Sequence, residues 1–309
     1  MVSFKKLITA TAALGLASFS MLPNAKAVEH IAPYLSGVST GVPAGALPPT
    51  GLYISNNTYF VSGQIVNNQG NNVGVKELEA ANALGAMWVA PEKFLGASYA
   101  IAMRQSYAFR GIQLPNHGSA NNSGLFNTIV TPVILSWKLP DHFYHSVGFS
   151  VYIPDGEFHT TTSSTGQKKV SSYAYANHYW TFQPNYAISY LNDGWDVTLN
   201  TLLNFNSKDT VTDYQSGDII YFDGTVSKKY NNWTLGLVGN YTAQFTDDSL
   251  YGSAANTAYN GNKFKMALLG PMVSYQFGKM NVMLRWMQPI YTDNTLKATW
   301  VHLTLGFKF

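Results

Sequence analysis

Residues 296–309, LKATWVHLTLGFKF, end the chain and separate into two faces when every second residue is taken. One face is apolar and carries Val301, Leu303, Leu305, Phe307 and Phe309. The opposite face is mixed and carries Ala298, Trp300, His302, Thr304, Gly306 and Lys308. Because side chains alternate along a β-strand, this pattern predicts a strand with one apolar and one polar surface. A strand of a soluble β-sandwich would fit the segment equally well, so the rest of the chain decides the fold.

From Gly51 onward, about twelve alternating segments follow one another. Short turns separate them at 91–93, 139–144, 191–194, 231–232 and 278–280, and long polar loops at 65–77, 111–126, 154–176, 207–217 and 246–262. This alternation is typical of outer-membrane barrels, which have short periplasmic turns and long external loops. The terminal strand also exceeds the ~9–11 residues that cross a bilayer, and it ends in an aromatic residue. We therefore predict an all-β fold, a transmembrane antiparallel β-barrel of about 12 strands.

The first 27 residues have the three parts of a secretory signal peptide. Lys5 and Lys6 form a positive region, residues 7–19 are apolar, and Ala25-Lys26-Ala27 fits a cleavage site. We expect cleavage after Ala27 and a location in the outer membrane of a Gram-negative bacterium.

The composition agrees with export to a membrane. Loss of Lys5, Lys6 and Lys26 lowers the count of Lys and Arg from 19 to 16, which balances the 16 acidic residues. A neutral chain has no electrostatic basis for nucleic-acid binding, so we expect no nucleic-acid partner. Charged residues make up 11%, far below the ~25% of average soluble chains, while mean hydropathy stays at −0.05. Alternating apolar and polar positions in a barrel explain both values.

Residues 28–50 precede the alternating segments and are irregular in pattern. They contain four prolines and several glycines, which disfavour regular structure. We expect this segment to lie in the periplasm or to fold inward as a plug, and residues 51–309 to form the barrel.

The alternation of side chains along each strand predicts which residues face the lumen. Pore-lining candidates are Arg104, Lys138, Asp196, Met266, Met272, Met283, Arg285 and His302. Arg285 is the clearest, since an arginine on the lipid face costs ~2–4 kcal/mol near the midplane. The charged members either line a pore and set its selectivity or pair with acids and fill the interior. The methionines suit a hydrophobic ligand or pack against a plug. In residues 127–138, the same alternation places Ile129, Val133, Leu135 and Trp137 outside.

No motif for catalysis or metal binding stands out. The chain has no Cys, and most of its seven His residues lie in predicted loops or turns. We find no nucleophile elbow, zinc motif or phosphate loop, and we predict neither a cofactor nor a metal site.

Several stretches together resemble a family of outer-membrane proteins named for the meta-cleavage pathway of phenol degradation. The resemblance is carried by residues 132–218, which include PVILSWKLP and HYWTFQPNYAISYLNDGWDVTLN, and by ALPPTGLYISNNTYF at 46–60, WTLGLVGNY at 233–241 and GPMVSYQF at 270–277. It implies a barrel that takes up aromatic or other hydrophobic compounds.

The expected function is thus an outer-membrane channel that admits small hydrophobic compounds, aromatic ones among them, by passive diffusion. Its expected partners are membrane lipid and that small hydrophobic substrate. Two alternatives remain open at this point: a barrel enzyme acting on lipid or ester, and a structural barrel without transport.

Overall fold

The computed structural model describes residues 32–115, 118–162, 166, 168–170, 175–250 and 263–309. The predicted signal peptide, residues 1–27, lies outside the described residues. Among those described, no helix is long and apolar enough to cross a membrane.

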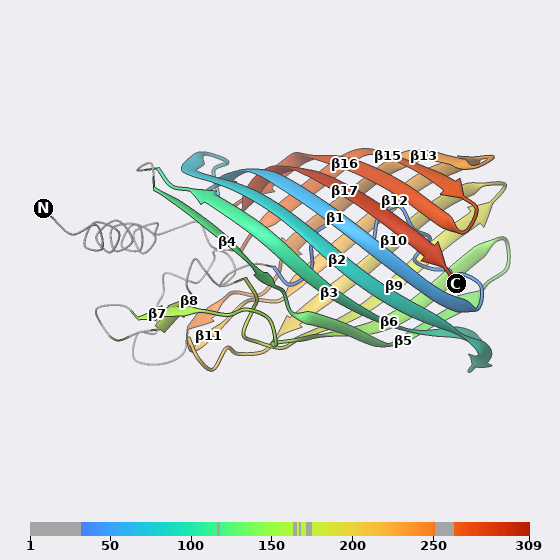
Figure 1. Ribbon diagram of the computed structural model, residues 1–309, viewed down its shortest axis with the longest axis horizontal. Helices are drawn as coiled ribbons and strands as arrows, with labels where there is room; N and C mark the ends of the chain where they lie inside the picture. The colour runs from blue at the N-terminus through green and yellow to red at the C-terminus, as the bar shows by residue number, and fades with distance from the viewer. Residues whose placement is uncertain (1–31, 116–117, 163–165, 167, 171–174, 251–262) are drawn as a thin grey trace, which may run out of the picture.

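Twelve antiparallel strands close into a barrel, as predicted (Figure 1). They are β1 (Gly51–Val66), β2 (Asn72–Phe94), β3 (Ala97–Gln113), β5 (Thr128–Lys138), β6 (Phe143–Ile153), β9 (Thr181–Asn192), β10 (Trp195–Asn206), β12 (Ile219–Tyr230), β13 (Trp233–Gln244), β15 (Lys265–Phe277), β16 (Met280–Asp293) and β17 (Leu296–Lys308). The last strand pairs with the first, with Tyr53 opposite Lys308 and Ile65 opposite Leu296. The Phe309 backbone N–H donates to the Leu52 carbonyl at 2.9 Å. Closure leaves no unpaired edge for lipid to meet.

Short turns gather at the end of the barrel that holds the C-terminus (Figure 1). Two of the two-residue turns, Leu95-Gly96 and Asp193-Gly194, have positive φ at both residues, as type I′ hairpin turns require. The opposite end carries the longer connections and their small strands. These strands are β4 (Ser119–Leu125), β7 (Thr160–Thr162), β8 (Lys168–Val170), β11 (Tyr214–Gln215) and β14 (Ser249–Leu250). By the rule for outer-membrane barrels, the short turns mark the periplasmic end and the long loops the extracellular end.

Four local expectations are wrong. The turn expected at 91–93 lies at Leu95-Gly96, because β2 extends to Phe94, and the expected loop 111–126 contains β4. The stretch 65–77 was expected to be a loop, but the loop spans only 67–71, because β2 begins at Asn72. Val75 packs there in a small cluster with Ile112 and Leu114, which stabilises the added strand length. Ile129 faces the lumen rather than the outside, because a bulge between Val130 and Val133 shifts the alternation of β5. Pro132 lies in the bulge and cannot donate a ladder hydrogen bond.

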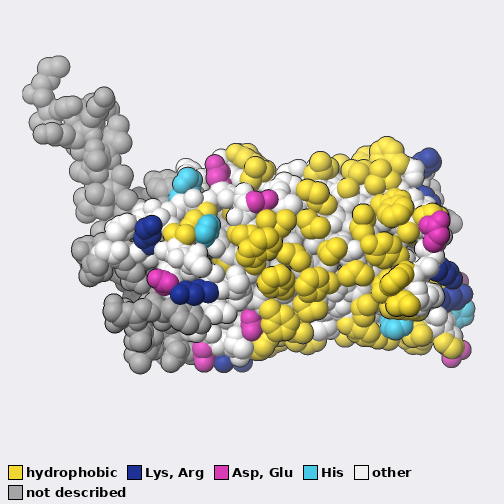
Figure 2. Space-filling view, turned by 90° about the horizontal axis from the view of Figure 1, so that it is seen from below, with side chains coloured by type: hydrophobic (Ala, Val, Ile, Leu, Met, Phe, Trp, Pro, Cys, Tyr) yellow, Lys and Arg dark blue, Asp and Glu magenta, His cyan; other side chains and the backbone are white. Residues whose placement is uncertain are grey.

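The outer wall is apolar between the two ends, where charged side chains gather (Figure 2). Large exposed side chains on this wall include Leu84, Trp88, Met103, Leu199, Leu235, Leu237, Leu284 and Trp286. An apolar belt around a closed antiparallel barrel is what a β-barrel in a bilayer requires. The fold is therefore that of an outer-membrane barrel.

Residues 32–50, which we call the lumen segment, run inside the barrel. Near the extracellular end, Tyr34 packs with Leu202, Ile219 and Tyr221 of the wall. At the periplasmic end, the Thr50 hydroxyl donates to the Ala90 carbonyl, and β1 begins at the next residue. The segment thus crosses the lumen lengthwise before the chain enters the wall.

Candidate functional site

Asp223 of β12 anchors the lumen segment in the extracellular half of the barrel. Its Oδ2 accepts hydrogen bonds from the Tyr34 hydroxyl at 2.5 Å and from the Ser39 hydroxyl at 2.7 Å. Its Oδ1 accepts the Asn240 amide at 2.7 Å. Tyr34 is the donor in this contact, since an ionised carboxylate can only accept.

Arg285 of β16 holds the segment from the other side of the lumen. The side chain is 1% exposed, and its Nη1 donates to the carbonyls of Val38 at 3.0 Å and Thr40 at 2.7 Å. Its Nη2 donates to the Thr304 hydroxyl at 2.9 Å. Backbone carbonyls, rather than a carboxylate, therefore hold this buried guanidinium within the described part of the chain.

Serine and threonine hydroxyls of the wall hold the segment along its length. Ser36 and Thr242 share a hydrogen bond of 2.9 Å between their hydroxyls. Towards the periplasm, the Gly45 N–H donates to the Ser189 hydroxyl, and the Ser136 hydroxyl donates to the Gly45 carbonyl. Individual hydrogen bonds of this kind contribute only about 1 kcal/mol each. Such side-chain bonds can be exchanged for water more readily than a strand ladder.

Methionines of β15 and β16 fill the space around the segment's glycines. Met266, Met272 and Met283 are buried in one cluster that Leu35 of the segment also contacts. Gly41 has a φ of +80°, which favours glycine, and a Cβ added there would lie 2.6 Å from the Met283 Sδ.

The remaining predicted site residues occupy different levels of the lumen. Lys138 is exposed and Asp196 half-buried, and both lie beside periplasmic turns. His302 is fully buried, with its ring edge-on to Tyr59 at 4.7 Å between centroids. Neither ring nitrogen of His302 has a hydrogen-bond partner among the described residues. Arg104 alone of the eight candidates lines the cavity described next.

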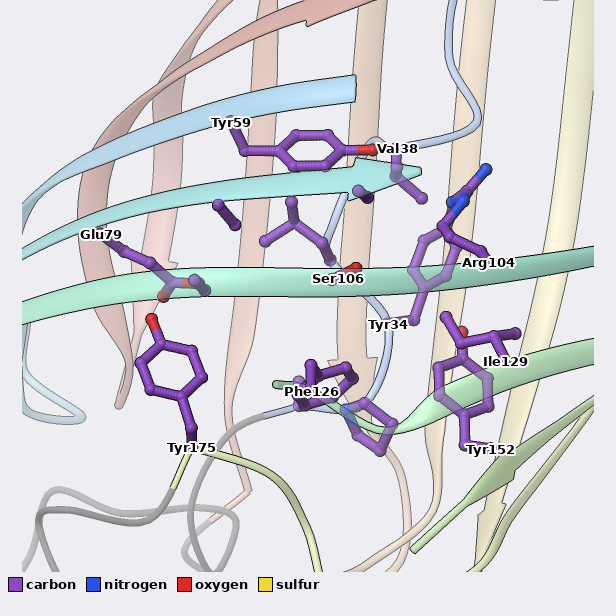
Figure 3. A pocket seen from close by; sticks show the side chains of 16 residues that line it. Tyr34, Val38, Tyr59, Glu79, Arg104, Ser106, Phe126, Ile129, Tyr152 and Tyr175 are labelled. Carbon is purple, nitrogen blue, oxygen red and sulfur yellow. The ribbon is translucent and has the colours of Figure 1, made fainter. Parts of the chain in front are cut away.

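A cavity of about 590 Å³, counting the space at its mouth, lies between the lumen segment and the wall formed by β1, β2, β3 and β5 (Figure 3). Its wall side is lined by small residues, Ala81, Ala83 and Ala108. Its other side is lined by Leu35 and Val38 of the lumen segment. Aromatic and aliphatic side chains complete the lining: Tyr34, Tyr59, Phe126, Ile129, Tyr152 and Tyr175. The lining therefore suits the apolar body of a small organic molecule.

Polar groups in this cavity are few and only partly paired. The hydroxyls of Tyr59 and Tyr175 are buried without a hydrogen-bond partner among the described residues. Burial raises the pKa of the Tyr175 hydroxyl, which keeps it neutral. Glu79 lies beside Tyr175, and Arg104 extends at the opposite side of the cavity (Figure 3). Unpaired buried hydroxyls are costly, so they indicate positions where water or a ligand binds.

Sequence reasoning did not single out Tyr59, Glu79 or Tyr175 as candidate lumen residues. For Tyr59 and Glu79 the signal was present, since strand parity places both on the inner face with Val61 and Ala81. Tyr175 lies in a loop, where no periodicity exists to orient a side chain. It approaches the barrel through Glu157, whose carbonyl accepts the Tyr175 N–H.

Comparison with protein families gives one match, over residues 62–304, to the family described as "Putative MetA-pathway of phenol degradation". The chain belongs to this family. The match spans the strands from β1 to β17, and it agrees with the resemblance seen in the sequence. Comparison with curated protein sequences gives no match.

Among solved structures, the fold is similar to an outer membrane channel from Pseudomonas putida F1. That similarity has a TM-score of 0.70 at 11% identity, over 85% of this chain and 97% of the channel. The β-domain of the Bordetella autotransporter BrkA is similar at a TM-score of 0.50 and 10% identity, over 84% of this chain and 100% of that domain. At these identities the likeness concerns the fold, which places this family member among outer-membrane barrels.

Proposed function

We propose that the protein is an outer-membrane channel for the passive uptake of small hydrophobic compounds, aromatic ones among them. The observation that carries this proposal is the apolar cavity inside a closed barrel. It lies in the extracellular half and is walled on one side by the lumen segment rather than by a strand. Family membership and the printed name of the Pseudomonas putida relative, a channel, support the same function.

The lumen segment would be the closure of this channel. It is held by side-chain hydrogen bonds from Asp223, Arg285 and wall hydroxyls, without ladder pairing to any described strand. Its displacement would join the cavity to the periplasmic end. Transport needs no energy source, since the compound moves down its concentration gradient.

The test is the initial rate of uptake of radiolabelled toluene and phenol by a Gram-negative host, at concentrations where outer-membrane passage limits entry. A strain that lacks the gene is compared with the same strain carrying it on a plasmid. We expect the plasmid to raise the rate several-fold, while uptake of a sugar stays the same. Equal rates in both strains would contradict the channel proposal and favour the structural barrel, which the occupied lumen also suits.

The enzyme alternative has no comparable support. Among the described residues, no group of three or more His, Asp and Glu side chains is placed to hold a metal ion. We propose a channel rather than an enzyme, which family membership and the similarity to a solved channel support.

A further inference from the structure

The cavity has two electrostatically different ends, set by the register of β2 and β3. Arg104 pairs with Gly85, Ala108 with Ala81, and Arg110 with Glu79. Gly85 and Glu79 are six residues apart on β2. Their Cα atoms are thus separated by roughly 20 Å along the strand. Between these ends lies the alanine-lined wall. A ligand in the cavity therefore meets an acid at one end and a guanidinium at the other.

Arg104 differs from the other two arginines of the chain. Arg110 forms an ion pair with Glu77 at 2.5 Å, and carbonyls of the lumen segment hold Arg285. Arg104 is half-buried at the cavity and forms neither an ion pair nor a hydrogen bond with any residue that the structure describes. A guanidinium in the lumen that lacks an acceptor is a site for an anionic group, which its planar fork binds in bidentate fashion.

Tyr59 adds a second donor at the same end. Its side chain is 4% exposed, its hydroxyl lacks a partner among the described residues, and the hydroxyl points toward the side where Arg104 and Val38 lie (Figure 3). The edge-on contact with the His302 ring fixes the orientation of the Tyr59 ring. One oxygen of a bound ligand could thus accept from the hydroxyl while the guanidinium binds the other.

We propose that this cavity is a binding site for small organic carboxylates with a flat apolar body. The carboxylate binds Arg104 and the Tyr59 hydroxyl, and the apolar body lies between the alanines of β2 and β3 and Leu35 and Val38 of the lumen segment. At the other end Arg110 is already paired with Glu77, so the reversed orientation finds no unpaired guanidinium there. The site would make the proposed channel select acidic over neutral compounds of the same shape. Its role in uptake rests on that proposed function.

Benzoate and benzamide test the charge selection, since they share a ring and differ in the acidic group. Binding of each to the full-length protein in detergent is measured by titration calorimetry. We expect wild type to bind benzoate about tenfold or more tightly than benzamide, as charge-assisted hydrogen bonds are about twice as strong as neutral ones. Arg104→Met should remove this preference, because it weakens benzoate binding far more than benzamide binding. Tyr59→Phe should weaken benzoate binding by about threefold to tenfold, and Arg104→Lys should keep most of the preference.

Lys138→Met is the matched control, because it removes a cation of the same barrel beside a periplasmic turn and should leave both affinities unchanged. Strand content by circular dichroism verifies that each variant folds. Equal affinities of wild type for the two ligands, or an Arg104→Met variant that still prefers benzoate, would overturn the proposal. Failure of the channel function gives a different result: benzoate still binds through Arg104, but uptake of benzoate, toluene and phenol is the same with and without the gene.

Discussion

At the scale of single residues, Arg285 decides how firmly the lumen segment is held. Its guanidinium contacts the Val38 and Thr40 carbonyls, which lie 247 and 245 positions away in the chain. Hydrogen bonds to a charged donor contribute about 1.5–3 kcal/mol each. We predict that Arg285→Met speeds amide hydrogen exchange at residues 37–41 at least tenfold, measured by mass spectrometry, without changing exchange in β12. Arg285→Lys keeps a donor in place and should give an intermediate rate. Unchanged exchange at residues 37–41 in Arg285→Met would show that Asp223 and the wall hydroxyls suffice.

At this scale, the sequence predicts which way the Arg285 side chain points but not which atoms accept its hydrogen bonds. The cost of an arginine in lipid was enough to predict that Arg285 points inward. Its acceptors are backbone carbonyls of a segment without periodicity, and no local pattern marks a contact over such a distance. For the same reason, strand alternation predicts that the methionines lie on the inner faces, but it does not predict their contacts with Gly37 and Gly41.

At the scale of strands, β1 and β2 carry a polar pair on their outer faces. The Asn56 and Asn82 amides donate to each other's Oδ1 at 2.9 Å, and Asn82 also donates to the Thr58 hydroxyl at 3.0 Å. In an apolar setting, an unpaired polar group costs about 1–3 kcal/mol, whereas replacing both partners is nearly neutral. We predict that Asn82→Val lowers the free energy of unfolding by about that amount and that Asn56→Val/Asn82→Val restores it. Urea unfolding from lipid vesicles, followed by tryptophan fluorescence, measures both. If the double variant were as unstable as Asn82→Val, the loss of stability would not come from the unpaired Asn56 amide, and the prediction would be wrong.

Alternation and loop length predict the wall strands and their order, but several strand details do not follow from them. Alternation fails at the β5 bulge because an extra residue reverses the parity beyond it, and this placed Ile129 on the wrong face. The start of β2 was missed because its Asn- and Gly-rich composition is typical of loops. The apolar cluster of Val75, Ile112 and Leu114 that stabilises it requires β3 as a neighbour.

At the scale of the whole molecule, the lumen segment and the barrel wall form a closed state, and the channel proposal requires an open one. The sequence left two places open for residues 28–50, periplasm or lumen, because irregular segments carry no pattern that sets their position. The structure places residues 32–50 inside, where hydrogen bonds to β9, β12, β13 and β16 hold them. Opening of the proposed channel therefore requires that this segment moves, and preventing that movement tests the proposal.

The chain offers a direct way to block that movement, since it contains no cysteine of its own. Ser36 and Thr242 are buried, and their hydroxyl oxygens lie 2.9 Å apart, so Ser36→Cys and Thr242→Cys would place two thiols side by side for oxidation to a disulfide. We predict that the oxidised double variant shows at least tenfold fewer channel openings in a planar bilayer and takes up phenol no faster than cells without the gene. Reduction should restore both activities, and the two single variants should behave as wild type under either condition. Equal conductance of the oxidised and reduced double variant would mean that solutes pass without release of the lumen segment. The route would then have to run through the cavity beside β1, β2 and β3 with that segment in place.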